Sequence, residues 1–448
     1  MRRRLVQIGN WLEQPVSIAP LVSFRVVFGA VMVFSTLRFW CLGWIEEHFR
    51  DTSFTFKYFG FEWVQLLPPA GMYALHALML LGALGVMLGF FYRWSAAVFF
   101  LTFSYAWLID LSYYLNHYYF ISIAAFLLML APAHARFSVD CWLWPRIRKT
   151  QTPRWAVDMF KWQIAVVYFY AGLAKINADW LLEALPLKIW APANDRLPGI
   201  GWLFEWAWTP WLFSWLGMLY DTTIVFWLSW ARTRLGAYLS VVAFHSITGL
   251  MFQIGVFPLV MMGGTWIFFS EKFHERLLGF FEKKHPMQLP VSAKLPPATP
   301  GWLVMLLSLH FAFQLLFPWR YLLYPGNLFW TEEGYRFSWR VMLMEKAGTA
   351  SFLVRDSQTG REGRVFNSDF LCNHQEKQMA MQPDMILQFA HFLKKYYAER
   401  GVHNPQVRAE VYVTLNARPS RLLIDPSVDL TKIRDNWQPK NWILPFEK

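Results

Sequence analysis

The residue best suited to chemistry in this sequence is Lys175, which ends an apolar, aromatic helix predicted to begin near Trp155. Three small residues, Ala171, Gly172 and Ala174, come just before it. A lysine at the end of an apolar helix is costly unless its ammonium reaches water or a partner, so Lys175 is a candidate functional residue. The structural alternative is a lysine whose long side chain reaches the membrane surface and anchors the helix there.

Other polar side chains fall at a similar depth in the predicted helices. Asn116 and His117 open one helix at the end that we expect to face outward, and His245 lies in the outer half of another. A lone histidine inside an apolar helix is more often a hydrogen-bonded packing residue than a catalytic one. The convergence of these residues with Lys175 at one level therefore predicts an active site at the membrane–water boundary.

The chemistry expected of such a site follows from the lysine. An amine in an apolar pocket gives up its charge more easily, and the neutral amine is then available as a base. A histidine or asparagine beside it can orient the amine or hold a substrate oxygen, and a tall aromatic pocket suits a flat lipid such as a quinone. Asp221 and Arg25 also lie inside predicted apolar helices, and we expect each to be paired, because buried charges need partners.

Composition defines the class of protein. The chain has 448 residues, of which 56% are hydrophobic and 19% aromatic, and its mean hydropathy is +0.26; these values are typical of a polytopic membrane protein. The net charge of +12 comes from basic residues that gather in short loops between apolar runs, where they set membrane orientation. The sequence contains no nucleic-acid-binding motif and no metal-ligand spacing, so we expect neither nucleic acid nor a metal ion as a partner.

The apolar runs predict an α-helical polytopic membrane protein with about nine transmembrane helices. With the N-terminus in the cytoplasm, the basic loops fall inside, and the odd number of crossings places the C-terminal segment outside. The absence of an Asn-X-Ser/Thr site favours a bacterial inner membrane over the endoplasmic reticulum of a eukaryote. The predicted helices cover residues 19–39, 70–91, 94–110, 116–132, 155–175, 210–230, 233–254, 255–269 and 299–319.

Two domains are predicted, a transmembrane catalytic domain over 1–320 and an extracytoplasmic α+β domain over 321–448. In the first domain, prolines break residues 180–209 into short helices at the outer face, and residues 284–300 are predicted to be a linker. In the second domain, residues 383–400 have the pattern of an amphipathic helix. The predicted strands are Val341 to Arg355, Arg361 to Phe366, Val407 to Leu415 and Arg421 to Asp425.

A set of motifs occurs in a fixed order along nearly the whole chain. The motifs are Ser23–Gly29, Leu81–Gly89 with Tyr92-Arg93, Leu115–Tyr119, Ala171–Trp180, Phe244-His245, Ile254–Phe257, Tyr335–Trp339, Arg355-Asp356 with Thr359-Gly360, and Ile424–Pro426 with Val428-Asp429. In their order and spacing the chain resembles the vitamin K-dependent γ-glutamyl carboxylases and their bacterial relatives, the HTTM (horizontally transferred transmembrane) group.

The resemblance implies a reaction. In that family a lysine deprotonates vitamin K hydroquinone, oxygen adds, and the resulting alkoxide removes a γ-proton from a glutamyl side chain. The carbanion attacks carbon dioxide to give γ-carboxyglutamate, and vitamin K leaves as the epoxide. The implied co-substrates are vitamin K hydroquinone, O2 and CO2, and the implied partners are a glutamate-containing protein or peptide and membrane lipid.

The resemblance also implies roles for residues of this chain. Lys175 matches the initiating base, Asn116 and His117 would support it and the quinone oxygens, and His245 would line the same pocket. A further group is expected near the glutamate and the quinone: Tyr335, Ser338 and Trp339. Lys188 stands where relatives often have a basic residue and is expected to bind the substrate carboxylate.

The sequence departs from the animal members of the family at two of these places. Ala174 stands where they carry a second lysine, and Met344 stands where they carry a histidine after the Ser-Trp pair. Two other functions remain open on the sequence alone. One is a quinol epoxidase or oxidase without carboxylation, and the other is a non-enzymatic membrane protein whose outer domain binds a ligand.

Overall fold

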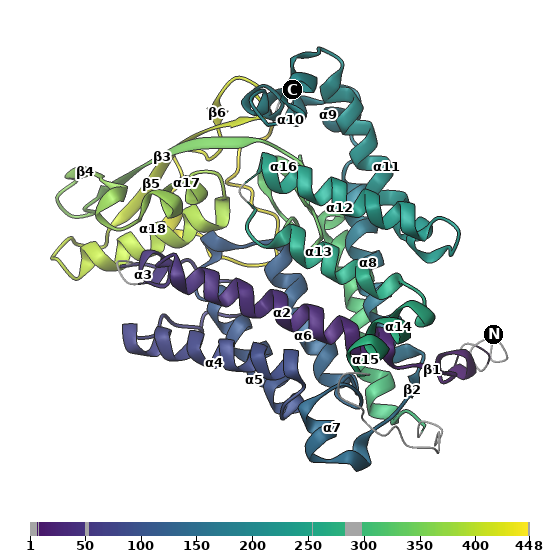
Figure 1. The fold of residues 1–448 in the computed structure, drawn as a ribbon. Coiled ribbons are helices and arrows are strands. Elements are labelled where there is room, and N and C mark those ends of the chain that lie inside the picture. Colours follow the sequence, from purple (N-terminus) through teal and green to yellow (C-terminus); the bar gives the residue numbers. More distant parts are fainter. Residues whose placement is uncertain (1–6, 8, 50–52, 253, 283–297, 447–448) are drawn as a thin grey trace.

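The computed structural model describes residues 7, 9–49, 53–252, 254–282 and 298–446. A bundle of helices makes up most of the molecule, and a small sheet with its own helices covers one end of it (Figure 1). Most of the predicted linker over residues 284–300 lies outside the described residues.

Helices form at all nine predicted positions within the described residues. They are α2 (Ala19–Cys41), α4 (Pro69–Leu88), α5 (Tyr92–Leu108), α6 (Asn116–Leu130), α8 (Trp155–Ala174), α11 (Thr209–Ser229), α12 (Arg234–Met251), α13 (Phe257–Thr265) and α15 (Gly301–Leu316).

The number of membrane crossings is a separate matter. Three helices of the described chain are long and apolar enough to span a bilayer, namely α2, α4 and the continuous helix Gly301–Leu323. The other helices are shorter or less apolar; α6, for example, has only 15 residues, below the roughly 20 that a perpendicular crossing needs. The nine predicted helices are therefore present, whereas nine crossings are not confirmed.

Small residues let the bundle helices approach one another closely. A Cβ atom at Gly29 of α2 would lie 2.5 Å from the Cα of Met87 on α4, and one at Gly82 of α4 would lie 2.8 Å from the backbone nitrogen of Phe99 on α5. Such small-residue crossings are typical of helices packed in a membrane, where the apolar solvent gives little driving force and close contact supplies the attraction.

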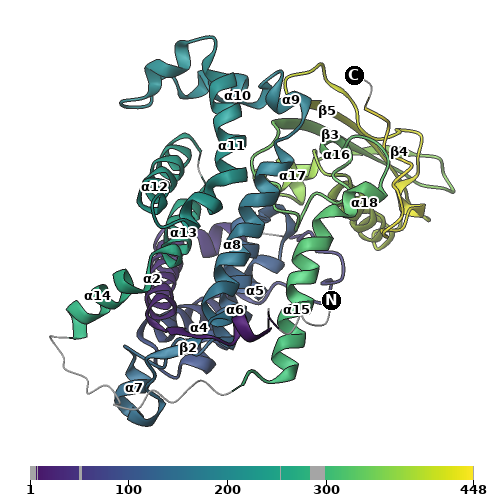
Figure 2. The same cartoon turned by 90° about the vertical axis from the view of Figure 1, so that its right-hand side faces the viewer.

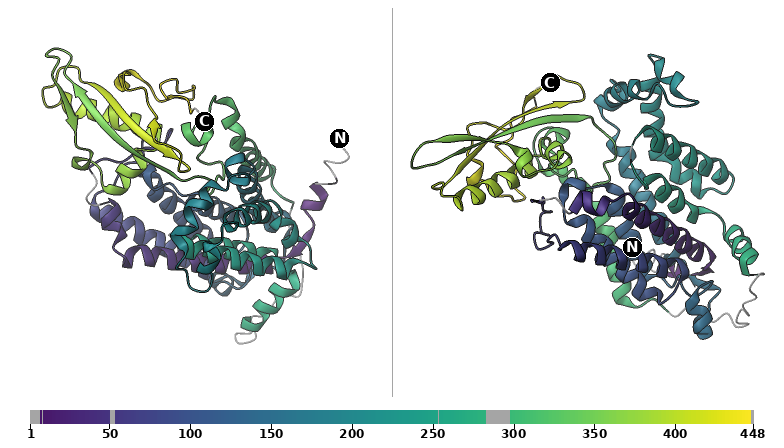
Figure 3. Two further views of the ribbon diagram at one scale, coloured as in Figure 1. Left: turned by 90° about the horizontal axis from the view of Figure 1, so that it is seen from above. Right: turned by 60° about the vertical axis from the view of Figure 1, so that its left-hand side comes forward.

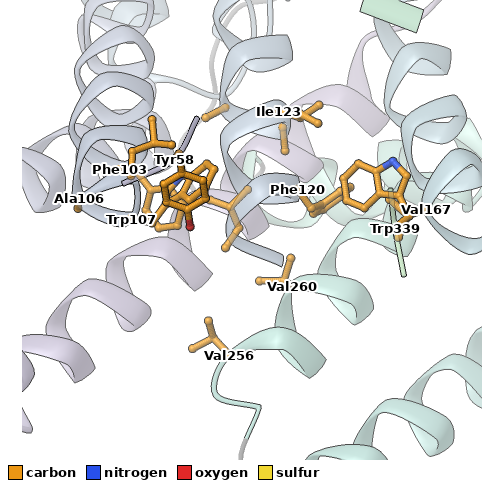
Figure 4. Close-up of a cluster of buried hydrophobic side chains, with 14 of the residues drawn as sticks. Tyr58, Phe103, Ala106, Trp107, Phe120, Ile123, Val167, Val256, Val260 and Trp339 are labelled. Atoms are coloured by element: carbon orange, nitrogen blue, oxygen red, sulfur yellow. The ribbon is translucent and has the colours of Figure 1, made fainter. Parts of the chain in front are cut away.

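A loop from the C-terminal part of the chain enters the bundle and contributes to its core. Figure 4 shows Trp339 of this loop beside Phe120 of α6 and Val167 of α8. The Trp339 side chain is completely buried, and its ring stacks on that of Tyr119 at 4.8 Å. The same core continues through Trp107 toward the other end of the cluster in Figure 4.

Between α8 and α11 the chain forms a series of short helices, as the prolines predict. These are α9 (Ala178–Leu181), α10 (Leu185–Trp190) and two 3-10 turns at Pro192–Asn194 and Gly201–Glu205. They form an arm that projects beyond the end of α11 (Figure 2). Exposed tryptophans are frequent on this arm and on the first turns of α11: Trp202, Trp206, Trp208, Trp211 and Trp215.

The C-terminal region contains a four-stranded antiparallel sheet in the order β4-β3-β5-β6 (Figure 3). Its strands are β3 (Lys346–Arg355), β4 (Glu362–Val365), β5 (Gln406–Leu415) and β6 (Arg421–Leu422). Alternate residues of β5 are buried, as its period-two pattern predicts.

Helices α17 (Asn373–Met379) and α18 (Pro383–Ala398) pack against this sheet and join it to the bundle. Gln375 of α17 donates to the Asp110 carboxylate at 2.7 Å, and Phe392 of α18 packs against Phe54 at 4.6 Å between ring centres. The prediction was wrong about where the first strand begins: residues 341–345 form a loop rather than a strand, because the segment starts at the bundle, where the Val341 carbonyl lies 3.5 Å from Lys175 Nζ and not against a neighbouring strand.

Candidate active site

Lys175 lies directly after the last residue of α8 and forms a buried ion pair with Asp221 of α11. The Lys175 Nζ donates to Asp221 Oδ2 at 2.7 Å and to the Ala171 carbonyl at 3.2 Å. Both side chains are 7% exposed, so water screens the pair little. The close crossing of α8 and α11 at Gly172, where a Cβ would lie 2.5 Å from Thr222 Cγ2, brings the two charges together.

A cavity of about 130 Å³ adjoins this pair, and we call it the lysine cavity. The Trp180 ring centre lies 5.2 Å from Lys175 Nζ, within range of a cation–π interaction. Apart from Lys175, Asp221, His245 and Thr248, the walls are mostly aromatic and aliphatic. The walls include Tyr168, Trp190, Phe213, Phe244, Phe252 and Phe257.

His245 enters the lysine cavity from α12 and is held by a tyrosine pair. Its Nε2 lies 2.8 Å from the Tyr168 hydroxyl, which lies 3.3 Å from the Tyr220 hydroxyl. The other ring nitrogen, Nδ1, is buried and has no hydrogen-bond partner among the described residues. A buried polar atom without a partner is unusual and marks a place where a ligand atom can be satisfied.

Asn116 and His117 line a second cavity of about 410 Å³, which we call the interface cavity because it lies between the start of α6 and the C-terminal region. Tyr335 lines the same cavity. Phe257, Val341 and Met342 border both cavities. The two groups of predicted residues are therefore neighbours on either side of a thin wall rather than members of one pocket.

Contacts across this wall are short. The Val341 carbonyl lies 3.5 Å from Lys175 Nζ on one side. On the other side, Asn116 Nδ2 donates to the Arg340 carbonyl at 2.8 Å. The ring of Phe257 lies between the two histidines, 5.6 Å from His117 and 5.3 Å from His245.

His117 differs from Asn116 in having no hydrogen bond from its ring to any residue that the structure describes. Its ring packs against Tyr118 and Phe257. It also borders a third cavity of about 320 Å³ whose walls include Trp44, His76 and Trp107. His117 is thus placed to contact a ligand from two sides.

Ser338 and Trp339 support the loop that carries the wall and are not among the residues that line the lysine and interface cavities. Ser338 Oγ accepts a hydrogen bond from Arg320 at 2.8 Å, and Trp339 Nε1 donates to Gln314 at 3.2 Å. Phe337, Trp339 and Met342 have φ values of 58°, 57° and 49°. Residues other than glycine rarely adopt this left-handed backbone conformation, so the surrounding packing must hold the loop in place.

Lys188 lies apart from both cavities. It is an exposed residue of α10, and its ammonium lies 4.1 Å from the centre of the Trp211 ring. It does not line the lysine cavity or the interface cavity. The structure therefore does not bring Lys188 to the other predicted site residues.

Of the two other charges inside the predicted apolar helices, Asp221 is paired as expected and Arg25 only in part. Arg25 is completely buried, and its Nη2 donates to the Phe137 carbonyl at 2.5 Å. Within the described chain it forms no ion pair. Among these same residues, no group of three or more His, Cys, Asp and Glu side chains is arranged to hold a metal ion.

Sequence reasoning missed two residues of this site. It noted Asp221 only as a buried charge, because its pairing with Lys175 depends on how two distant helices cross. It also passed over Arg340, although Arg340 directly follows the Ser338-Trp339 motif. The signal was a charged residue beside that motif, and the fold was needed to show that it faces a cavity.

Two known protein families match two consecutive regions of the chain. Residues 13–273 match the family model described as HTTM domain, and residues 299–448 match the one described as Vitamin K-dependent gamma-carboxylase, lumenal domain. The chain belongs to the vitamin K-dependent gamma-carboxylase family. No solved structure matches it.

The two matched regions of this gamma-carboxylase family member meet at the candidate site. Lys175, Asp221 and Asn116 belong to the HTTM match, whereas Arg340 and Val341 belong to the lumenal-domain match. Family membership points to vitamin K-dependent carboxylase function in a membrane protein. The wall between the cavities is therefore built by both regions together.

Proposed function

We propose that this protein is an integral-membrane carboxylase that converts protein-bound glutamate to γ-carboxyglutamate, using CO2 and O2, coupled to conversion of vitamin K hydroquinone to its epoxide. The observation that carries the proposal is the position of the Lys175–Asp221 pair. The pair faces the apolar, aromatic lysine cavity. A wall one residue thick separates it from the more polar interface cavity. Such an arrangement suits a lipid-soluble reductant and a charged peptide substrate that must react together.

The residues of the lysine cavity fit a quinol in their chemistry. Its walls are aromatic, and the unpartnered His245 Nδ1 offers a polar contact for a ring oxygen. When bound, the quinol supplies, with O2, the strong base that removal of a glutamyl γ-proton requires. Lys175 accepts the hydroxyl proton as the neutral amine, after it has lost its own proton, and Asp221 stabilises the ammonium that results, which is the ion pair seen in the structure.

The remaining residues orient the two substrates. Asn116 holds the Arg340 backbone and so fixes the wall between the cavities. His117, whose ring has no hydrogen bond to a described residue, contacts a substrate oxygen, and Tyr335 lines the glutamate side. Ser338 and Trp339 maintain the loop. No metal ion takes part in this proposal.

The proposed domain arrangement follows the charge and apolar pattern. The transmembrane catalytic domain comprises residues 1–320 with nine crossings, and the extracytoplasmic domain comprises residues 321–448. The N-terminus lies in the cytoplasm, and the membrane is the bacterial inner membrane. The interface cavity then opens on the outer side, where protein substrates are met.

The decisive assay separates the two products. Purified protein in lipid, given vitamin K hydroquinone, a Glu-containing peptide and labelled bicarbonate, should fix label and form epoxide together. Epoxide without fixed label would instead select a quinol epoxidase or oxidase. Formation of neither product would favour a non-enzymatic membrane-binding protein.

Cysteine labelling tests the topology. In a background in which the exposed Cys41 and Cys372 are serine, a cysteine replacing the exposed Asn404 should react fully with an impermeant maleimide in intact cells. A cysteine replacing the exposed Lys272 on α14 (Glu271–Glu282) should react only after permeabilisation. The reverse pattern would refute the proposed orientation.

A further inference from the structure

Arg340 is a buried arginine that lacks a counter-ion. Its side chain is 9% exposed, and it forms no ion pair with any residue in the described part of the chain. The guanidinium lies over the Tyr321 ring, 4.3 Å from its centre, and its Nε has no hydrogen-bond partner among the residues that the structure describes. Burying a charge without a partner costs several kcal/mol on the order of magnitude known for proteins, so a function is expected to compensate.

A neighbouring arginine in the same cavity, Arg336, has the counter-ion that Arg340 lacks. Arg336 also lines the interface cavity, and it forms an ion pair with Asp384. Burial alone would lower the pKa of Arg336, yet Asp384 holds that pKa above its ordinary value. Burial lowers the pKa of Arg340, and the neighbouring Tyr321 and Tyr335 oppose this shift only in part.

The interface cavity as a whole carries an excess of positive charge. Four cationic residues line it: Arg336, Arg340, Lys346 and Lys377. Lys346 is neutralised by Glu332 at 2.9 Å, as Arg336 is by Asp384. The other acidic residue in the wall, Glu345, accepts from Trp190 at 2.7 Å. Arg340 is thus the buried cation of this cavity whose charge is left for a ligand.

Arg340 is also directly coupled to the proposed reaction site. Its own carbonyl is held by Asn116 at 2.8 Å, and the carbonyl of the next residue, Val341, faces Lys175 Nζ at 3.5 Å. The backbone of Arg340 is therefore one residue away from the contact with Lys175, and Arg340 itself lines the interface cavity. The planar guanidinium suits a single carboxylate, which it can bind through two parallel hydrogen bonds.

We propose that Arg340 binds the γ-carboxylate of the glutamyl substrate in the interface cavity. This assignment rests on the proposed function and replaces Lys188 as the carboxylate ligand. When the γ C–H bond breaks, its proton passes to the base formed in the quinol reaction, and the electron pair stays on the γ-carbon beside the carboxylate. The Arg340 cation stabilises the additional negative charge, and that electron pair then forms the bond to CO2.

The test compares Arg340→Gln, Arg340→Lys and Lys188→Gln, with Arg364→Gln on the exposed strand β4 as the matched control. The probe is a fluorescent, terminally blocked peptide with one Glu, set against the same peptide with Gln, and its binding to the protein in lipid is measured without turnover. Wild type and Arg364→Gln should prefer the Glu peptide. Arg340→Gln should lose that preference, with a Kd for the Glu peptide about 30- to 3,000-fold higher, and Arg340→Lys should retain part of it.

Retention of the Glu preference by Arg340→Gln, or its loss in Lys188→Gln, would overturn the assignment. The thermal midpoint, which should stay close to that of wild type, checks that each variant is folded. The binding readout separates this inference from the proposed function. A Glu preference that depends on Arg340, without fixed CO2, would refute carboxylation but keep the site. Carboxylation by Arg340→Gln with an unchanged KM for the peptide would refute the Arg340 site but support the proposed carboxylase function.

Discussion

Replacing Lys175 with alanine should lower both epoxide formation and CO2 fixation by about 10²- to 10⁴-fold, the contribution expected of a general base. Both products should fall together, because the proton transfer that Lys175 performs precedes both. The measurement is the pair of initial rates at saturating quinol and Glu peptide. Lys161→Ala, on the same helix but paired with Asp158, is the control and should leave both rates within a factor of about two, since Lys161 does not line the lysine cavity and a partly exposed ion pair contributes little.

Lys175→Arg distinguishes a base from an anchoring charge. Arginine keeps the positive charge and the length needed to reach Asp221, but its guanidinium stays protonated and cannot accept a proton. The variant should therefore fold like wild type and be nearly as inactive as Lys175→Ala. An active Lys175→Arg enzyme would show that Lys175 only anchors the end of α8.

The helices of the bundle were predictable because each long helix can be identified from its own stretch of sequence. A run of apolar residues such as Ala19–Cys41 needs no knowledge of its neighbours to be identified. The start of β3 was not, since residues 341–345 have an apolar pattern that fits a strand equally well. The Val341 carbonyl faces Lys175 of the bundle instead of a neighbouring strand, and that contact joins residues far apart in the sequence.

The residue types of the site were predictable, but the separation of these residues into two cavities was not. Lys175, His245, Asn116 and His117 do converge, but Phe257 and residues 341–342 separate them into two cavities. Sequence depth along a helix gives the level of a side chain and not its direction. The same reason explains Lys188, which has a suitable charge and position in the chain but points away to Trp211.

The Lys175–Asp221 pair gives the second large effect, and it appears in stability. Removing one partner of a buried ion pair leaves an uncompensated charge and costs about 3–5 kcal/mol. Asp221→Leu should therefore lower the free energy of unfolding by about that amount, measured by denaturant titration in mild detergent. The control is Thr223→Val on the same helix, which removes the hydrogen bond from the Thr223 hydroxyl to the Leu219 carbonyl and should change stability by less than about 1 kcal/mol.

The double variant Lys175→Met/Asp221→Leu tests whether the cost belongs to the pair. Replacing both charges by apolar side chains of similar size is often neutral or stabilising, so most of the stability lost in Asp221→Leu should return while activity stays absent. Stability and activity then separate in one protein: the pair is retained for proton transfer and not for folding. If the two substitutions instead destabilise additively, the residues do not depend on each other as charges. In that case Asp221 cannot be what stabilises the ammonium of Lys175.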